Sequence, residues 1–195
     1  MFGKFGIRSM TMDDISRQLG ISKKTLYQHV EDKADLVNRV IDLDIGMARD
    51  LADGLDSPDT NAIASLIAIN EQILRQRRYL SPTFRYDLRK YYPEAYRHWT
   101  GEKRRFLERI IVANMDRGKA EDLYRKELEG SVIADLYISY VSRMEIEDPI
   151  ESQGELSDDE LREIFIYHLH GICSRSGIEY LKQNTDMSNE QRSNQ

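Results

Sequence analysis

The sequence predicts an all-α protein made of a small N-terminal head and a larger helical body. Apolar residues recur at helical spacing nearly from end to end, and no stretch shows the alternation of a β-strand. The chain has only four prolines and 11 glycines, and 32% of its residues are charged, which is typical of helical proteins. A helix, a glycine turn and a second short helix lie near the start, which predicts a head at residues 1–40 and a body at residues 41–195.

Composition excludes several classes of protein. The single cysteine, Cys173, excludes an internal disulfide framework and a cysteine-based zinc site, and it fits a reducing compartment. No apolar run approaches the ~18 residues of a membrane span, because Ser65 interrupts the longest one at residues 62–69. No charged leader precedes an apolar segment. We therefore expect a cytoplasmic protein with no membrane partner.

Two short helices are expected in the head. Thr11 can cap the first, and its inner face carries Ile15 and Leu19 one turn apart. Gly20 ends this helix, because glycine adopts the left-handed conformation at little cost. Ser22 can then cap the second helix.

The body begins with a long helix at residues 33–53, which at 1.5 Å per residue spans about 31 Å. Along the chain it alone joins the head to the body, so we expect a ligand in the body to act on the head through it. Further helices are expected at residues 60–78, from Ser81-Pro82 onward, at 93–119, at 129–144 and at 157–182, with an acidic linker at 145–159 and a polar, frayed end from 184.

Charge is distributed unevenly along the chain. The net charge is −6, yet residues 1–33 hold six basic and four acidic side chains, so the acidic excess lies in the body. Phosphate neutralisation dominates affinity for DNA, and a basic head on an acidic body is compatible with DNA binding by the head alone.

The two short helices have the spacing of a helix-turn-helix, whose second helix lies in the major groove. If Leu26 and Val30 face inward, the polar side chains of residues 23–29 point outward or lie at the rim. Gln28 can then pair with an adenine edge, and Thr25 can meet a thymine methyl group or a phosphate. The side chains suited to phosphate contacts are Lys23, Lys24, Tyr27 and Lys33. The N-terminus of the third helix also points its amides at the backbone. On spacing alone, a helical hairpin with a solvated basic face fits equally well.

The head closely resembles the N-terminal domain of the TetR family of bacterial transcriptional regulators, over about 36 residues. The matching pieces are the F-x-x-x-G of residues 2–6, Thr11, Ile15, the Leu-Gly-Ile-Ser turn of residues 19–22, the Thr-Leu-Tyr of residues 25–27, His29 and Lys33. The resemblance implies a three-helix DNA-binding head, a helical body for ligand binding and dimerisation, and repression relieved by a small ligand. The DNA-contacting positions that it carries over are Thr11, Lys23, Lys24, Thr25, Tyr27, Gln28, His29 and Lys33. Asp13 departs from the basic or polar residue common in the family, and no contact is expected for it.

The start of the head is short for this family. Members have a full first helix before F-x-x-x-G, whereas only residues 1–5 stand here. We expect a missing segment of about 10 residues, roughly three turns of helix. Without it, Ile15, Leu26 and Val30 are expected to be poorly covered.

Aromatic residues gather between residues 79 and 106 and predict a ligand pocket in the body. The pocket residues expected are Tyr79, Phe84, Tyr86, Tyr92, Tyr96, Trp99 and Phe106. Core packing explains any one of them more simply. Residues 75–109 also carry 11 basic and four acidic side chains, which suits an anionic ligand, a solvated face, or pairing with the acidic residues 120–164.

The last helices predict half of a four-helix dimer interface, with an intrachain core as the alternative. The interface residues expected are Leu136, Tyr140, Leu161, Phe165, Leu169 and Ile172. The resemblance favours the dimer, since many members dimerise through their last two long helices.

Neither a metal site nor a catalytic site is expected, and no cofactor. His168 and His170 face different sides of a helix, so with Cys173 they do not form a ligand set. The sequence therefore predicts a non-enzymatic, homodimeric bacterial repressor that binds a near-palindromic double-stranded operator and releases it when an unknown small-molecule effector binds. The alternatives are a ligand-binding or adaptor protein whose head no longer binds DNA, and a helical enzyme using His98 or His168.

Overall fold

The computed structural model describes residues 1–55, 60–77, 80–146 and 157–193, and every element in these ranges is a helix. The head holds α1 (Phe2–Phe5), α2 (Met12–Leu19) and α3 (Lys23–Leu26). The body holds α4 (Lys33–Leu55), α5 (Ala62–Arg77), α6 (Pro82–Tyr91), α7 (Pro93–Ala120), α8 (Gly130–Ile146), α9 (Asp158–Ile172) and α10 (Arg175–Ser193). The predicted all-α fold is confirmed. The described residues pair as strand only in an isolated bridge between Tyr124 and Cys173.

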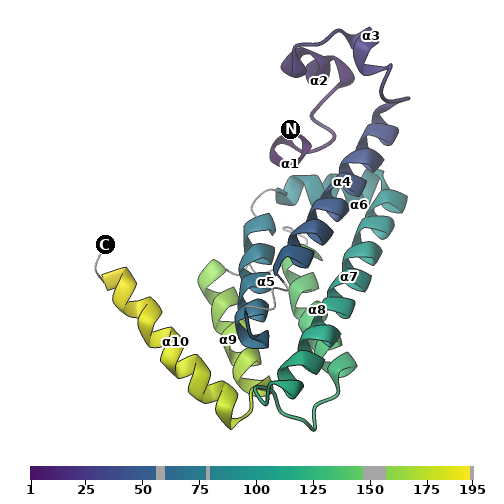
Figure 1. Ribbon diagram of the computed structural model, residues 1–195. Coiled ribbons are helices and arrows are strands. Elements are labelled where there is room, and N and C mark those ends of the chain that lie inside the picture. The colour runs from purple at the N-terminus through teal and green to yellow at the C-terminus, as the bar shows by residue number, and fades with distance from the viewer. Residues whose placement is uncertain (56–59, 78–79, 147–156, 194–195) are drawn as a thin grey trace.

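The head lies at one end of an elongated molecule, and α4 runs from it into the body (Figure 1). In the body α7 is central, since it contacts α4, α5, α6 and α8. α10 diverges from α9 toward the C-terminus (Figure 1). No helix in the described ranges is long and apolar enough to cross a membrane.

Local capping explains where several helices begin. The Thr11 hydroxyl accepts a hydrogen bond from the Asp14 amide at 3.1 Å, and the Asp14 carboxylate accepts one from the Thr11 amide at 3.0 Å. Ser157 and Glu160 form the same reciprocal arrangement at the start of α9. Ser81 caps α6 just before Pro82. The predicted starts at these serine and threonine residues are correct, because capping depends only on neighbours in sequence.

The single helix predicted for residues 157–182 is wrong, because the chain breaks between α9 and α10. The Ser174 amide donates to the Leu123 carbonyl at 2.9 Å, and the Arg125 amide donates to the Ile172 carbonyl at 2.9 Å. The segment after α7 therefore takes the backbone groups that would have continued α9. A Cβ on Gly177 would lie 2.2 Å from the Leu123 carbonyl oxygen, so the start of α10 also depends on this close approach.

Two large apolar cores hold the described parts of the molecule together. The larger one joins α5, α7, α8, α9 and the start of α10. The other extends from the head through α4 into α6 and α7, and includes Phe2, Leu26, Ile41, Leu88 and Trp99. The head is therefore packed against the body rather than carried by α4 alone. The boundary predicted at residue 40 falls within both α4 and this second core.

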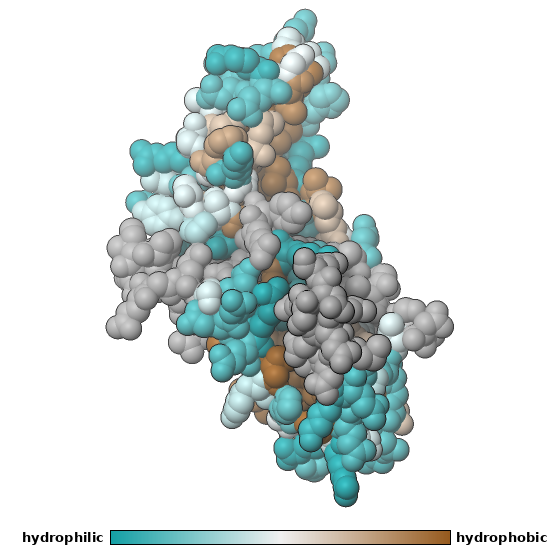
Figure 2. Space-filling model, turned by 90° about the vertical axis from the view of Figure 1, so that its left-hand side faces the viewer, coloured by the Kyte–Doolittle hydropathy of each residue, from teal (hydrophilic) through white to brown (hydrophobic). Residues whose placement is uncertain are grey.

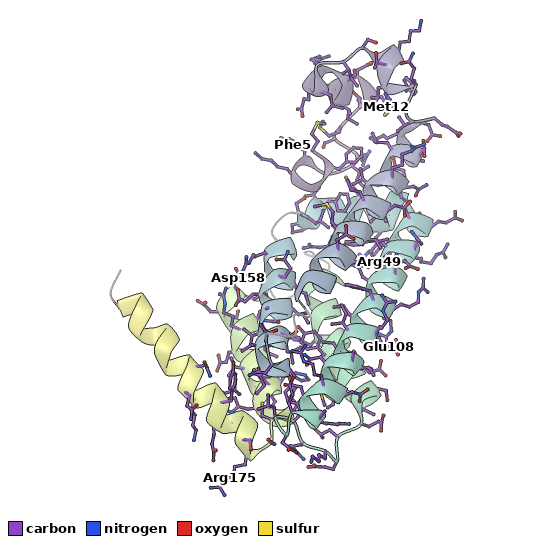
Figure 3. The ribbon with its side chains drawn as sticks, in the orientation of Figure 1. Phe5, Met12, Arg49, Glu108, Asp158 and Arg175 are labelled. Carbon is purple, nitrogen blue, oxygen red and sulfur yellow. The ribbon has the colours of Figure 1, made fainter. Side chains whose placement is uncertain are left out.

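Polar contacts fasten α4 to α7. The Trp99 indole N–H donates to the Asp44 carboxylate at 2.8 Å, and the Lys103 ammonium lies 3.4 Å from the same carboxylate and 4.3 Å from the indole centroid. Farther along, Arg49 of α4, labelled in Figure 3, pairs with Glu102 of α7. These contacts hold residues 44–49 of α4 against α7.

Candidate nucleic-acid interface

The α2–α3 segment folds as a helix-turn-helix. Gly20 adopts φ 69° and ψ 23° at the end of α2, the left-handed conformation that glycine reaches without steric cost. The Ser22 hydroxyl then accepts a hydrogen bond from the Thr25 amide at 3.0 Å and starts α3. Gly20 therefore ends α2 and Ser22 caps α3, as the sequence predicted.

The buried side of α3 is also as predicted. Leu26 and Val30 are 5% and 6% exposed and belong to the second core. The predicted DNA-facing residues that are exposed are Thr11, Lys23, Lys24, Tyr27, Gln28 and His29, while Thr25 is half-buried beside Ser22. The apolar side of this segment packs into the core, so its polar, basic side faces solvent.

α3 itself is short, and its end differs from a regular helix. Only residues 23–26 are α-helical, and the next turn tightens as the amides of Gln28 and His29 donate to the carbonyls three residues back, at 3.2 and 3.0 Å. Gln28, the predicted base-reading residue, therefore lies in this tighter turn.

An ion pair that sequence analysis missed crosses the two helices. The Lys23 ammonium lies 2.9 Å from the Asp13 carboxylate, and this hydrogen bond raises the pKa of Lys23. Both side chains are more than half exposed, so the pair adds little stability. A phosphate can compete for the same ammonium. The i,i+10 spacing across a turn carries no signal from which the pair could have been predicted.

Lys33 and the start of α4 differ from the prediction in one respect. Lys33 is half-buried, and burial lowers its pKa while Asp87 of α6 opposes that change. At the helix start, the Asp32 carboxylate accepts a hydrogen bond from the Asp35 amide at 2.8 Å. This amide, expected to point at the DNA backbone, is thus already capped by an acidic side chain.

An apolar groove of about 200 Å³ opens beside the head core. Its walls come from the first residues of the chain, α2, α3 and α4, and are lined by Met1, Phe2, Gly3, Ile15, Leu19, Leu26, Leu36 and Val40. Apolar side chains reach the surface at this end of the molecule, among them Met1, Phe5 and Leu19 (Figure 2). The poor cover predicted for Ile15, Leu26 and Val30 is nevertheless wrong, because Phe2 and α4 bury all three.

Four of the predicted pocket aromatics lie in or against the second core, and the others do not join them. Phe84 and Trp99 are each 1% exposed and meet edge to face, with centroids 6.3 Å apart. Tyr92 and Tyr96 pack partly against the same core, Tyr86 bonds to Lys90 on α6, and Phe106 is buried on α7. Tyr79 lies outside the described residues. For Phe84 and Trp99 this placement favours core packing, the alternative left open by the sequence.

Most of the predicted dimer residues lie inside one chain. Leu161, Phe165, Leu169 and Ile172 are all buried in intrachain contacts. The Tyr140 hydroxyl donates to the Leu161 carbonyl at 2.5 Å, which ties α8 to α9. Of the six, only Leu136 is well exposed, at 58%.

His168 of α9 and Cys173, which follows α9, are both packed inside the chain. Among the described residues, no group of three His, Cys, Asp or Glu is placed to hold a metal ion. The His168 ring lies 5.6 Å from that of Tyr137, and burial lowers its pKa. Cys173 is buried, which raises the pKa of its thiol to about 11 and keeps it protonated near neutral pH.

Comparison with known proteins identifies the head. The family model for bacterial regulatory proteins of the tetR family matches residues 1–40. No curated protein sequence matches the chain.

Solved structures share the fold along most of the chain. A gamma-butyrolactone receptor (ArpA-like protein) has a TM-score of 0.65 at 16% identity, covering 97% of this chain and 90% of that one. The reduced form of NemR from E. coli has a TM-score of 0.67 at 15% identity, covering 89% and 92%. SCO4454, a TetR-family transcriptional regulator from Streptomyces coelicolor, has a TM-score of 0.66 at 15% identity, covering 87% and 86%. The family model therefore matches the helix-turn-helix head, and the chain shares its fold with solved structures that include a TetR-family transcriptional regulator.

Proposed function

We propose that the protein is a homodimeric repressor that binds a near-palindromic DNA operator through α2 and α3 and releases it when a small molecule binds the body. A regulator of the kind that the family model of the head describes would act by binding and not by catalysis. The observation that carries the proposal is the exposed face formed by Lys23, Lys24, Gln28 and His29, held outward by buried Leu26 and Val30.

The side chains of this face divide into two roles. Lys23, Lys24 and Tyr27 would contact phosphates, which fix the position of the head without reading sequence. Gln28 would read a base edge in the major groove, where its amide can both donate to and accept from adenine. Half-buried Lys33 would contribute less than the two lysines of α3.

Dimerisation would use the exposed faces of α8 and α9 instead of the buried residues between them. Val132 and Leu136 lie one turn apart on α8 and are 55% and 58% exposed. Ile164 and Tyr167 share a face of α9 and are 38% and 81% exposed. Large contiguous apolar patches mark interaction sites on protein surfaces, so these exposed side chains are the candidates for the contact.

A gel shift with the upstream region of the protein's own gene tests the proposal. We expect a complex that survives an excess of unrelated DNA, and a Lys24→Ala variant that binds all DNA more weakly. Lys182→Ala, which removes an exposed lysine of α10, serves as the matched control and should bind like the wild type.

The adaptor function would gain support if no DNA fragment were bound. Asp13 favours that alternative, because it places a carboxylate against Lys23 on the face that would meet phosphate. An Asp13→Asn variant that bound DNA when the wild type did not would identify this residue as the cause.

A further inference from the structure

Asp13 and Lys23 meet on the exposed side of the helix-turn-helix. Asp13 follows Met12, which is labelled at the start of α2 in Figure 3, and Lys23 is the first residue of α3. The Lys23 ammonium lies 2.9 Å from a carboxylate oxygen of Asp13, and the side chains of Lys23 and Asp13 are 52% and 59% exposed. A binding partner that reaches the Lys23 ammonium in this position therefore meets the Asp13 carboxylate as well.

The Asp13 carboxylate takes no part in starting its own helix. The cap of α2 uses the next residue, Asp14, which exchanges hydrogen bonds with Thr11. The Asp13 side chain instead reaches across the turn to α3. An exposed ion pair adds little to the stability of a fold, so the main effect of this carboxylate is on whatever binds the same face.

A carboxylate in this place is unsuited to the DNA backbone but suited to a base edge. A phosphate that took the Lys23 ammonium would leave Asp13 unpaired beside a negatively charged backbone. In the major groove, guanine presents the acceptors O6 and N7, and its partner cytosine presents the N4 amino group as a donor. Lysine donates to guanine, and aspartate accepts from cytosine. An ammonium and a carboxylate held 2.9 Å apart therefore offer a donor beside an acceptor, the complement of a G·C edge.

We propose that Asp13 and Lys23 together read one G·C base pair in the major groove, with Lys23 donating to guanine and Asp13 accepting from cytosine. The ammonium has three N–H donors, so its bond to Asp13 leaves two for guanine. A recognition helix contacts base edges with its N-terminal residues, and Lys23 is the first residue of α3. The inference rests on the proposed DNA binding. It moves Lys23 from the phosphate-contacting residues to the base-reading ones, leaves Lys24 and Tyr27 on phosphates, and gives Asp13 a contact that the sequence did not predict.

Selection from random double-stranded DNA, followed by affinity measurements with the full chain, tests this inference. The wild type should enrich a half-site with a G·C pair at one position, and Asp13→Ala and Lys23→Ala should both relax that same position. On fragments that differ only there, the wild type should bind G·C about fivefold or more tightly than A·T. Each variant should lose most of this preference, and the double variant should lose no more than either one, because the two side chains act together. Lys24→Ala is the matched control, since it removes the neighbouring exposed lysine and should weaken binding to both fragments while keeping the preference.

Three results would overturn the inference while leaving the proposed function in place. An Asp13→Ala variant that bound every fragment more tightly by the same factor would show that Asp13 is only a charge repelled by phosphate. Losses of preference that add up in the double variant would show that Asp13 and Lys23 act separately. An enriched half-site with no G·C position that both variants relax would show that the pair reads no base. A wild type that enriched no sequence would instead refute the proposed function, and the base-reading pair with it.

Discussion

At the scale of single residues, Gln28 is one side chain on which base recognition depends. It is exposed in the turn after α3, and replacing it with alanine removes the amide that pairs with a base edge. Gln28→Ala should reduce the preference for the best site by about 1–3 kcal/mol while leaving binding to random DNA nearly unchanged. Fluorescence anisotropy with both DNAs measures this. An equal loss on both would show that Gln28 contacts only the backbone.

His168 makes stability depend on pH. Its Nε2 is buried and has no hydrogen-bond partner among the described residues, and burial holds its pKa below the ordinary value of 6.5. The unfolded chain therefore takes up a proton as pH falls below 6.5, while the folded protein resists it, so the free energy of unfolding should fall.

Urea unfolding between pH 7.5 and pH 5 measures the effect. His168→Phe should flatten the pH dependence, because the ring contact with Tyr137 remains and the titrating group is gone. His170→Gln, at an exposed histidine of the same helix, should keep the wild-type dependence. Equal slopes for wild type and His168→Phe would assign the pH dependence to other groups.

Sequence predicts single residues well where their role depends on near neighbours. The caps at Thr11 and Ser22 and the left-handed Gly20 follow from contacts within four residues, and the inward side of Leu26 follows from the local spacing of apolar residues. The bond from Arg8 to Asp87 joins residues 79 positions apart, and neither residue has a local feature that signals it. Such contacts depend on the packing of whole helices.

At the scale of elements, the seam between α4 and α7 depends on Trp99. The side chain is fully buried, meets Phe84, and bonds to Asp44 of α4. Trp99→Ala should therefore lower the free energy of unfolding by about 3–5 kcal/mol. Denaturant unfolding followed by circular dichroism measures this change.

Met47→Ala is the matched control, since it removes a 60% exposed apolar side chain of α4 and should cost far less. A Trp99→Ala variant as stable as the wild type would restore the interpretation of Trp99 as a pocket residue.

The periodicity of apolar residues predicted that these helices exist, but it did not predict the break at Ser174. It arises because residues 122–125, some 50 positions away, hydrogen-bond to the backbone and side chain there.

At the scale of the whole molecule, assembly should depend on the outer faces of α8 and α9. Leu136→Asp and Tyr167→Asp place charge on exposed positions, so each chain should fold and the dimer should dissociate. Light scattering measures the mass, and circular dichroism checks the fold. Phe165→Asp should instead unfold the chain, because Phe165 is buried within it. Dimers of unchanged mass for both surface variants would place the interface elsewhere.

The periodicity of apolar residues could not distinguish the outer faces of α8 and α9 from their inner faces, since each helix carries apolar residues on both. Only the packing within one chain shows that Phe165 and Leu169 are buried in its core while Tyr167 is exposed. The head was predictable in sequence because its motif is local, whereas the surfaces of the body depend on contacts between distant segments.

Selection from a random pool of double-stranded DNA by the purified full chain tests the central claim most directly. Two heads on a symmetric dimer should select a near-palindrome whose half-sites lie one helical turn of DNA, about 10 base pairs, or a multiple of it, apart. Each bound DNA should carry an even number of chains. Recovery of no enriched sequence, or of a single half-site bound by one chain, would contradict the account.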